Sequence, residues 1–142
     1  MADDGGSDFA RSMSIATSGL RAQAARMRVI SENIANADST GQTAGGDPYR
    51  RKIPTFTSEL DRTLDARVVT LGRVRPDASA FRVRYEPNNP AADAAGNVKY
   101  PNVNSVVEMT DMRQAQRSYE ANLNIISATR RMIQRTLDIL KA

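Results

Sequence analysis

The chain has 142 residues, of which 40% are hydrophobic and 5% aromatic, and its formal net charge is +4. It contains no Cys and no His, which excludes disulfides, thiolate catalysis, Ser-His triads and most zinc sites. The length suits one ordinary domain, but the few aromatic residues predict a thin hydrophobic core.

Residues 1–6 form a short, acidic, Gly-containing segment that we expect to be disordered. A helix is predicted over residues 7–37, with Ser7 at its N-cap. Positions spaced alternately by four and three residues are nearly all apolar here, as in the seam of a coiled coil. This N-terminal seam comprises Phe9, Met13, Ala16, Leu20, Gln23, Met27, Ile30, Ile34 and Ala37.

Two other features of the N-terminal helix are open to two interpretations each. A second stripe of small or apolar residues either widens the face toward one partner helix or contacts a second neighbour. It consists of Ile15, Ser18, Ala22, Ala25 and Val29. Asn33 and Asn36 lie within one turn, although Asn is a poor helix former. The plain interpretation is that Asn36 caps the helix and Asn33 is exposed to solvent, but two Asn residues within one turn invite a further reason.

The middle of the chain changes from a helical to a strand pattern. Residues 38–48 (DSTGQTAGGDP) are rich in Gly and polar side chains and predict a flexible linker. The clean alternation from Phe81 to Tyr85 predicts a strand, residues 68–74 and 49–57 are weaker strand candidates, and residues 59–66 favour a short helix. We therefore expect residues 49–104 to form a small β-rich insert with a turn-rich end.

Candidate sites for metal or catalysis are weak. Asp93 lies near Gly96 as in a calcium loop, but the spacing lacks a full ligand set, so a turn is the better interpretation. Asp61 and Asp65 would lie one helical turn apart on a polar face, where solvation is the default, and no nucleophile–base pair is evident. We expect no catalytic residue, no metal, no cofactor and no enzymatic activity.

A second long helix is predicted over residues 105–142, because no Pro or Gly follows Val103. Ser105 and Glu108 have the spacing of a capping box at its start. The predicted C-terminal seam comprises Met109, Met112, Gln116, Tyr119, Leu123, Ile126, Arg130, Ile133, Leu137 and Leu140. Such a helix is too long for the core of a small domain, so it needs an equally long partner.

The expected fold is therefore predominantly α with a small β-rich insert (α+β), with the two terminal helices paired as a coiled coil. Gln23 and Gln116 interrupt the seams and could fix their register, whereas Arg130 would lay its stem over apolar neighbours and keep its charge in water. With one narrow seam per helix, the isolated chain is either marginally stable or a stable antiparallel helix pair.

Charge and hydropathy give further predictions. The tight basic clusters are Arg50-Arg51-Lys52 and Arg130, Arg131 and Arg135, and we interpret both as solvated faces, so no nucleic-acid partner is expected. Neither a cleavable secretory signal nor an apolar run long enough to span a bilayer is evident. These patterns alone predict a cytoplasmic protein that is not embedded in a membrane.

Three stretches carry a recognisable combination of residues, at residues 18–37, 85–104 and 108–122. Their most telling members are Ser18, Gly19, Leu20, Asn33, Ile34, Asn36, Pro101, Asn102, Val103, Met109, Tyr119, Glu120 and Asn122. Together they resemble the family of flagellar rod and hook axial proteins, and the middle stretch resembles that of one rod subunit. Asn88-Asn89 departs from the pattern, since relatives often carry Gly-His there.

The resemblance implies a structural subunit of the proximal rod in the bacterial flagellar basal body. Such subunits assemble helically through their terminal helices and help to form the torque-transmitting drive shaft. The resemblance also implies type III export and assembly in the periplasm, which replaces the cytoplasmic interpretation. The implied partners are copies of the chain, other rod and basal-body proteins and the export apparatus. Alternatives are a sister rod subunit of the FlgB type and, less favoured, a basic coiled-coil binding protein.

Overall fold

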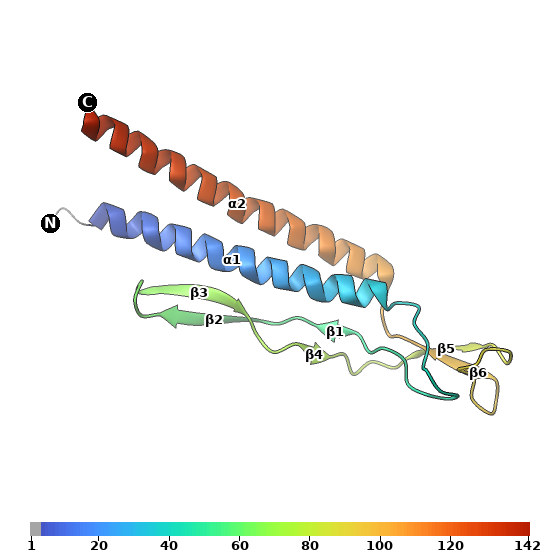
Figure 1. The fold of residues 1–142 in the computed structure, drawn as a ribbon. Helices are drawn as coiled ribbons and strands as arrows, with labels where there is room; N and C mark the ends of the chain where they lie inside the picture. The colour runs from blue at the N-terminus through green and yellow to red at the C-terminus, as the bar shows by residue number, and fades with distance from the viewer. Residues whose placement is uncertain (1–3) are drawn as a thin grey trace. The chain divides into compact units, whose positions relative to one another are not determined.

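The computed structural model describes residues 4–142, which form two long helices with six short strands between them (Figure 1). The helices are α1 (Asp4–Ala35) and α2 (Ser105–Lys141). The strands are β1 (Lys52–Ile53), β2 (Phe56–Asp61), β3 (Ala66–Leu71), β4 (Arg75–Pro76), β5 (Arg82–Tyr85) and β6 (Asn97–Tyr100). The α+β class expected from the sequence is confirmed.

The chain divides into two compact units. Unit 1 contains the residues up to Arg26, residues 56–72 and residues 114–142. Unit 2 contains residues 27–55 and 73–113. Each unit therefore combines part of α1, part of α2 and some of the strands, rather than matching one continuous stretch of sequence.

In unit 1 the two helices are antiparallel and the strands form one hairpin. Gly19 of α1 lies against Asn122 of α2, where a Cβ on residue 19 would come 2.8 Å from Asn122 Nδ2. Further along, Arg26 Nη2 donates to Gln114 Oε1 at 3.2 Å. A Cβ at residue 19 would therefore have to displace the Asn122 amide.

The hairpin of unit 1 pairs β2 with β3 in antiparallel register, from Phe56 opposite Leu71 to Asp61 opposite Ala66. The helix predicted over residues 59–66 is therefore wrong. Asp61 Oδ1 accepts hydrogen bonds from the backbone N–H groups of Thr63 and Leu64 and so organises the turn. The β-branched residues that follow favour the strand.

Unit 2 contains two further two-stranded sheets, β1–β4 and β5–β6, both antiparallel. Its buried apolar residues are Val29, Ile30, Ala37, Ala91, Val98, Tyr100 and Val103. Asp93 Oδ1 accepts from the N–H groups of Ala95 and Asn97 and therefore belongs to a turn. Among the described residues, no group of acidic side chains could hold a metal ion.

The helix ends differ in detail from the sequence-based expectations. Of the segment expected to be disordered, residues 1–3 lie outside the described residues and residues 4–6 belong to α1. α1 ends at Ala35, where Asn36 Nδ2 donates to Glu32 O at 2.8 Å. The cap of α2 is Asn104, whose Oδ1 accepts from Val106 N at 3.0 Å. The predicted capping box is wrong, because the Glu108 side chain bonds elsewhere.

Candidate functional site

Asn33 is fully buried in unit 2, and its side-chain amide makes four hydrogen bonds. Its Nδ2 donates to Lys52 O at 2.8 Å and to Glu108 Oε2 at 3.1 Å. Its Oδ1 accepts from Lys52 N at 2.9 Å and from the Tyr49 hydroxyl at 2.8 Å. Asn33 is therefore not solvent-exposed, and it joins α1 to both β1 and α2.

Glu108 is 1% exposed and anchors the next part of the network. Arg51 Nε donates to Glu108 Oε1 at 2.6 Å, and Arg51 Nη1 lies 3.4 Å from Asp77 Oδ2. Burial would lower the pKa of Arg51, but its bonds to Glu108 and Asp77 outweigh this and raise it. The interpretation of Arg51 as part of a solvated face is therefore wrong, because this guanidinium neutralises a buried carboxylate.

Asn102 extends the same network to the loop before β5. Its Oδ1 accepts from Arg51 N at 2.8 Å, and its Nδ2 donates to the backbone oxygens of Asp77 and Ser79. Next to it, Pro101 and Val103 are buried. Asn33, Asn102 and Glu108 come from the three signature stretches of the sequence, which thus meet in unit 2. Each of these residues bonds to at least one of residues 49–52.

The network perturbs the Tyr49 hydroxyl. Burial, followed by the negative charges of Glu32 and Glu108, raises the pKa of Tyr49 to about 12. The neutral hydroxyl is therefore favoured, which fits its role as donor to Asn33. The hydrogen bonds of this network join α1, β1 and α2 to one another.

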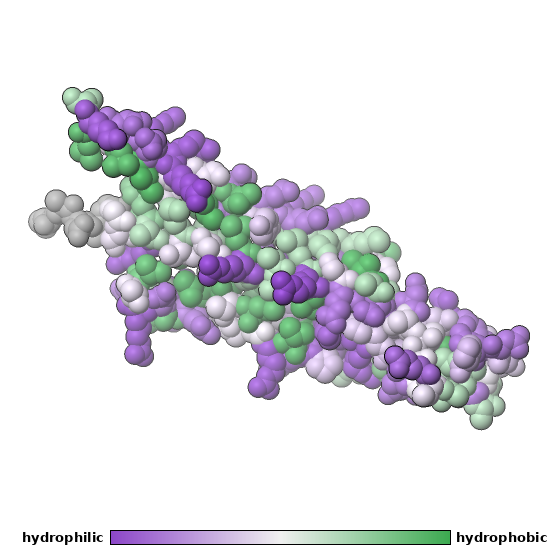
Figure 2. Space-filling model, viewed as in Figure 1, coloured by the Kyte–Doolittle hydropathy of each residue, from purple (hydrophilic) through white to green (hydrophobic). Residues whose placement is uncertain are grey.

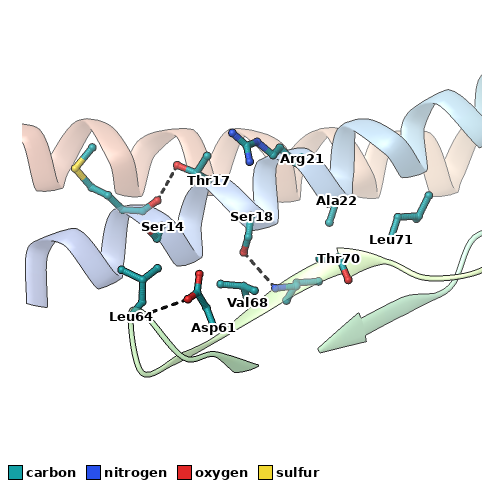
Figure 3. A pocket seen from close by; sticks show the side chains of 12 residues that line it. Ser14, Thr17, Ser18, Arg21, Ala22, Asp61, Leu64, Val68, Thr70 and Leu71 are labelled. Carbon is teal, nitrogen blue, oxygen red and sulfur yellow. Dashed lines mark hydrogen bonds between the residues drawn. The ribbon is translucent and has the colours of Figure 1, made fainter. Parts of the chain in front are cut away.

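In unit 1 the first signature stretch holds the hairpin against α1. Ser18 Oγ accepts from Val69 N at 3.2 Å and donates to Ile15 O at 2.7 Å. Figure 3 shows Ser18 reaching from α1 to β3, beside a groove of about 570 Å³. Gly19 allows the approach of Asn122, and Leu20, the next residue of α1, is half-buried.

The predicted C-terminal seam is only half correct as a description of what α2 covers. Met112, Tyr119, Ile126 and Ile133 are half-buried, as the seam requires. Glu108, Ala115 and Thr129 are buried and Asn122 is half-buried, each one residue before a predicted seam residue, and Ser105, Asp111, Ser118 and Ala128 are also half-buried. Met109, Gln116, Leu123 and Arg130 are exposed instead. A line of small and polar side chains therefore lies on the inward side of α2. The larger apolar side chains remain on the flank of this helix.

The remaining seam residues differ in exposure from one end of the helix pair to the other. Phe9, Met13 and Met27 are half-buried, and Ile30 is buried. Leu137 and Leu140 near the end of α2 are exposed, as is Glu120 of the signature. Ile34 and Asn36 are half-buried.

Exposed apolar side chains are concentrated on the C-terminal part of α2. Leu123 and Ile125 are each 46% exposed, and Met132, Leu137, Ile139 and Leu140 are exposed as well. Figure 2 shows this apolar surface in green along the C-terminal part of α2. Patches of this kind on a soluble protein mark interaction sites. In the described part of the chain, neither helix has the length and apolar character needed to cross a bilayer.

Comparisons with known proteins agree on one family. The family described as "Flagella basal body rod protein" matches residues 13–41, and "Flagellar basal body rod FlgEFG protein C-terminal" matches residues 94–139. The "Flagellar basal-body rod protein FlgC" of Agrobacterium fabrum is 54% identical over 128 residues, which cover 90% of this chain and 92% of the relative. Those of Aquifex aeolicus and Salmonella typhimurium are 36% and 40% identical, covering 94% and 88% of this chain and 98% and 92% of the relatives.

Proposed function

The chain belongs to the FlgC family of flagellar basal-body rod proteins, and we propose that it joins neighbouring rod subunits through its terminal helices. It is a structural subunit of the flagellar basal body. We place it in the proximal rod, where copies of the chain and other rod proteins together form a helical, torque-transmitting shaft. The FlgB-type alternative is less well supported, because the three relatives described above carry the name FlgC.

The observation that carries the assembly proposal is the exposed apolar flank of α2. A Leu or Ile that becomes fully buried contributes about 1.5–3 kcal/mol. Leu123, Ile125, Met132 and Leu137 make only part of that contribution within one chain, because each is close to half exposed. A neighbouring helix that covered them would supply it. Coiled-coil pairing with neighbours, rather than within the chain alone, then accounts for the heptad spacing.

The kind of assembly follows from the difference between the surfaces. Contacts between two unlike patches are heterologous, and when the rotation does not close they generate a helical tube. The flank of α2 is one such patch, and Ile15, the exposed member of the α1 stripe, belongs to another, whereas Ala22 and Val29 of that stripe are buried within the chain. Interlocked long helices also resist bending, which suits a shaft that transmits torque.

The cellular setting is proposed from the family. The chain would leave the cytoplasm through the flagellar type III apparatus and assemble in the periplasm, without embedding in the membrane. Its role would be purely structural, with no reaction, cofactor or nucleic-acid partner.

Electron microscopy of basal bodies from a strain that lacks the gene tests the proposal. We expect the rod and everything beyond it to be missing, and the intact gene to restore them. The matched control is a strain that lacks a flagellar gene whose product acts earlier in assembly. It shows how basal bodies look when the rod is lost. Complete basal bodies and normal swimming in the deletion strain would contradict the proposal.

A further inference from the structure

The hairpin β2–β3 of unit 1 carries an apolar face that is exposed to solvent. Directly opposed residues of an antiparallel pair have their side chains on the same face. One face, which we call the outward face, comprises Phe56, Ser58, Leu60, Arg67 and Val69, and the strand partner of Phe56, Leu71, lines the groove against α1. Of these, Phe56 is 41% exposed, Leu60 is 56% exposed and Val69 is 37% exposed.

The other face of the hairpin is the more polar one. It contains Thr57, Glu59 and Asp61 on β2, and Thr57 and Thr70 bond to each other across the strands at 2.9 Å. A hairpin on a soluble protein normally buries its apolar face and solvates its polar face. The face toward α1 buries Ala66 and half-buries Val68, but the outward face carries the larger apolar side chains and leaves Phe56, Leu60 and Val69 exposed, which marks it as a binding surface.

A groove in the same unit offers an apolar surface of matching kind. It lies between α1 and α2 and is lined by Asp8, Arg11, Ser12, Ile15, Ala16, Asn122 and Ile125. Ile15 and Ile125, on opposite walls, are 42% and 46% exposed. We call it the helix groove.

Charge decides which surface the outward face meets. Arg67 is the one charged residue of the outward face. Two outward faces brought together would place two Arg67 charges in one contact without an acidic partner, which is unfavourable. The helix groove instead offers the Asp8 carboxylate, which is exposed and pairs only at 3.6 Å with Arg11.

We propose that the outward face of the hairpin in one copy of this chain binds the helix groove of the next copy, with Arg67 paired to Asp8. The contact is heterologous, so repeating it adds subunits in an open series rather than closing a dimer. The inference rests on the proposed function, because it names two of the surfaces through which subunits meet.

Chemical cross-linking tests the contact directly, because the chain has no Cys and an introduced thiol is therefore unique. Cells would co-express an affinity-tagged Leu60→Cys chain and an untagged Ile125→Cys chain, and isolated basal bodies would be treated with a short bismaleimide. Each copy carries one thiol, so every cross-linked pair joins two copies. Gln116→Cys is the matched control, because residue 116 is exposed on α2 about two and a half turns from residue 125, on the opposite side.

We expect cross-linking between the Leu60→Cys and Ile125→Cys chains and little between the Leu60→Cys and Gln116→Cys chains. Equal yields, or cross-linking between Leu60→Cys chains alone, would overturn the proposed contact. If a tagged chain without an introduced Cys is also absent from the isolated basal bodies, the proposed function is overturned instead. The two failures are therefore distinguishable.

A charge exchange covers the case in which the Cys variants do not assemble. Arg67→Asp and Asp8→Arg should each reduce swimming, because each places like charges at the contact. The double variant should swim better than either single variant, since the pair is restored with reversed polarity. A double variant that swims worse than both single variants would contradict the proposal.

Discussion

The two units use buried surface in opposite ways. In unit 2, Asn33 and Glu108 are fully buried and fully bonded, and apolar residues such as Ile30 and Val98 are covered within the chain. In unit 1, Ala16, Ala22 and Ala115 make a close but thin contact, while Leu123 and Ile125 stay exposed. Unit 2 therefore builds a core within the chain, although Val83, Tyr85, Val106, Val107 and Met109 are exposed there, whereas unit 1 leaves more of its large apolar side chains exposed.

This difference separates stability from assembly. Substitutions in the polar network of unit 2 should unfold the chain, whereas substitutions on the flank of unit 1 should leave it folded and prevent the rod from forming. The four predictions below test that separation and are ordered by their expected effect on the free energy of unfolding.

Glu108→Ala should have the largest effect. It leaves the partly buried Arg51 guanidinium without its main partner and Asn33 Nδ2 with one acceptor fewer. We expect the free energy of unfolding to fall by about 3 kcal/mol, as when one partner of a buried ion pair is removed. Urea denaturation of the purified chain measures it. Glu120→Ala, at an exposed site of the same helix, is the control, and an equal effect in both variants would contradict the role of the network.

Gly19→Ala should cost less, and its sign should depend on Asn122. The new Cβ would displace the Asn122 amide and break its bond to Ser118 O, so we expect a loss of about 1 kcal/mol. In an Asn122→Ala background the obstacle is gone, and the same substitution should stabilise the helix by about 0.5–1 kcal/mol. Thermal unfolding of the four chains measures this. A loss of the same size in both backgrounds would show that the contact does not matter.

Alkaline pH should destabilise the chain through Tyr49. The pKa of Tyr49 is raised from 10.0 to about 12 in the folded chain. As the pH rises, the unfolded chain therefore loses the hydroxyl proton first. Between these two pKa values the folded chain binds more protons. The stabilising contribution is therefore complete below pH 10 and is lost as the pH rises toward 12. The pKa of Tyr100 is also raised, chiefly by its bond to Glu86, so part of the slope should remain in Tyr49→Phe. A slope that Tyr49→Phe leaves unchanged would exclude Tyr49 as its source.

Leu123→Asp should have the smallest effect on stability, within about 0.5 kcal/mol, because the side chain already lies at the surface. Swimming should nevertheless be lost, since a charge would occupy the flank proposed for subunit contacts. Ile126→Asp, at a half-buried position on the same helix, should lower both stability and swimming. Normal swimming of the Leu123→Asp strain would remove this part of the flank from the assembly surface.

The sequence predicted the classes of the elements well and their packing less well. Heptad spacing identified both long helices, because apolar periodicity depends only on the helix itself. It placed the C-terminal seam on the largest apolar residues, whereas the inward line passes through Ala115, Asn122 and Thr129. A periodicity analysis gives weight to large side chains and cannot tell a face covered within one chain from a face kept for another.

The polar network was the least predictable feature. Asn33 attracted notice as a poor helix former, but its partners are 16–75 residues away in the sequence. Arg51 looked like any residue of a basic cluster, and Glu108 had the spacing of an ordinary capping box. A buried ion pair depends on tertiary contacts, and only the family signature, which includes Asn33 and Asn102, pointed toward this region.

The bonds of Asn33 have a consequence for how the free subunit behaves. β1 pairs with β4 along one edge only, and an unpaired strand edge is a template on which other chains can aggregate. The Asn33 amide donates to Lys52 O and accepts from Lys52 N, and so takes the place of a peptide group in a neighbouring strand. A helix side chain thereby seals the edge of β1. A subunit that waits for its place in a growing structure keeps this edge closed to unwanted partners.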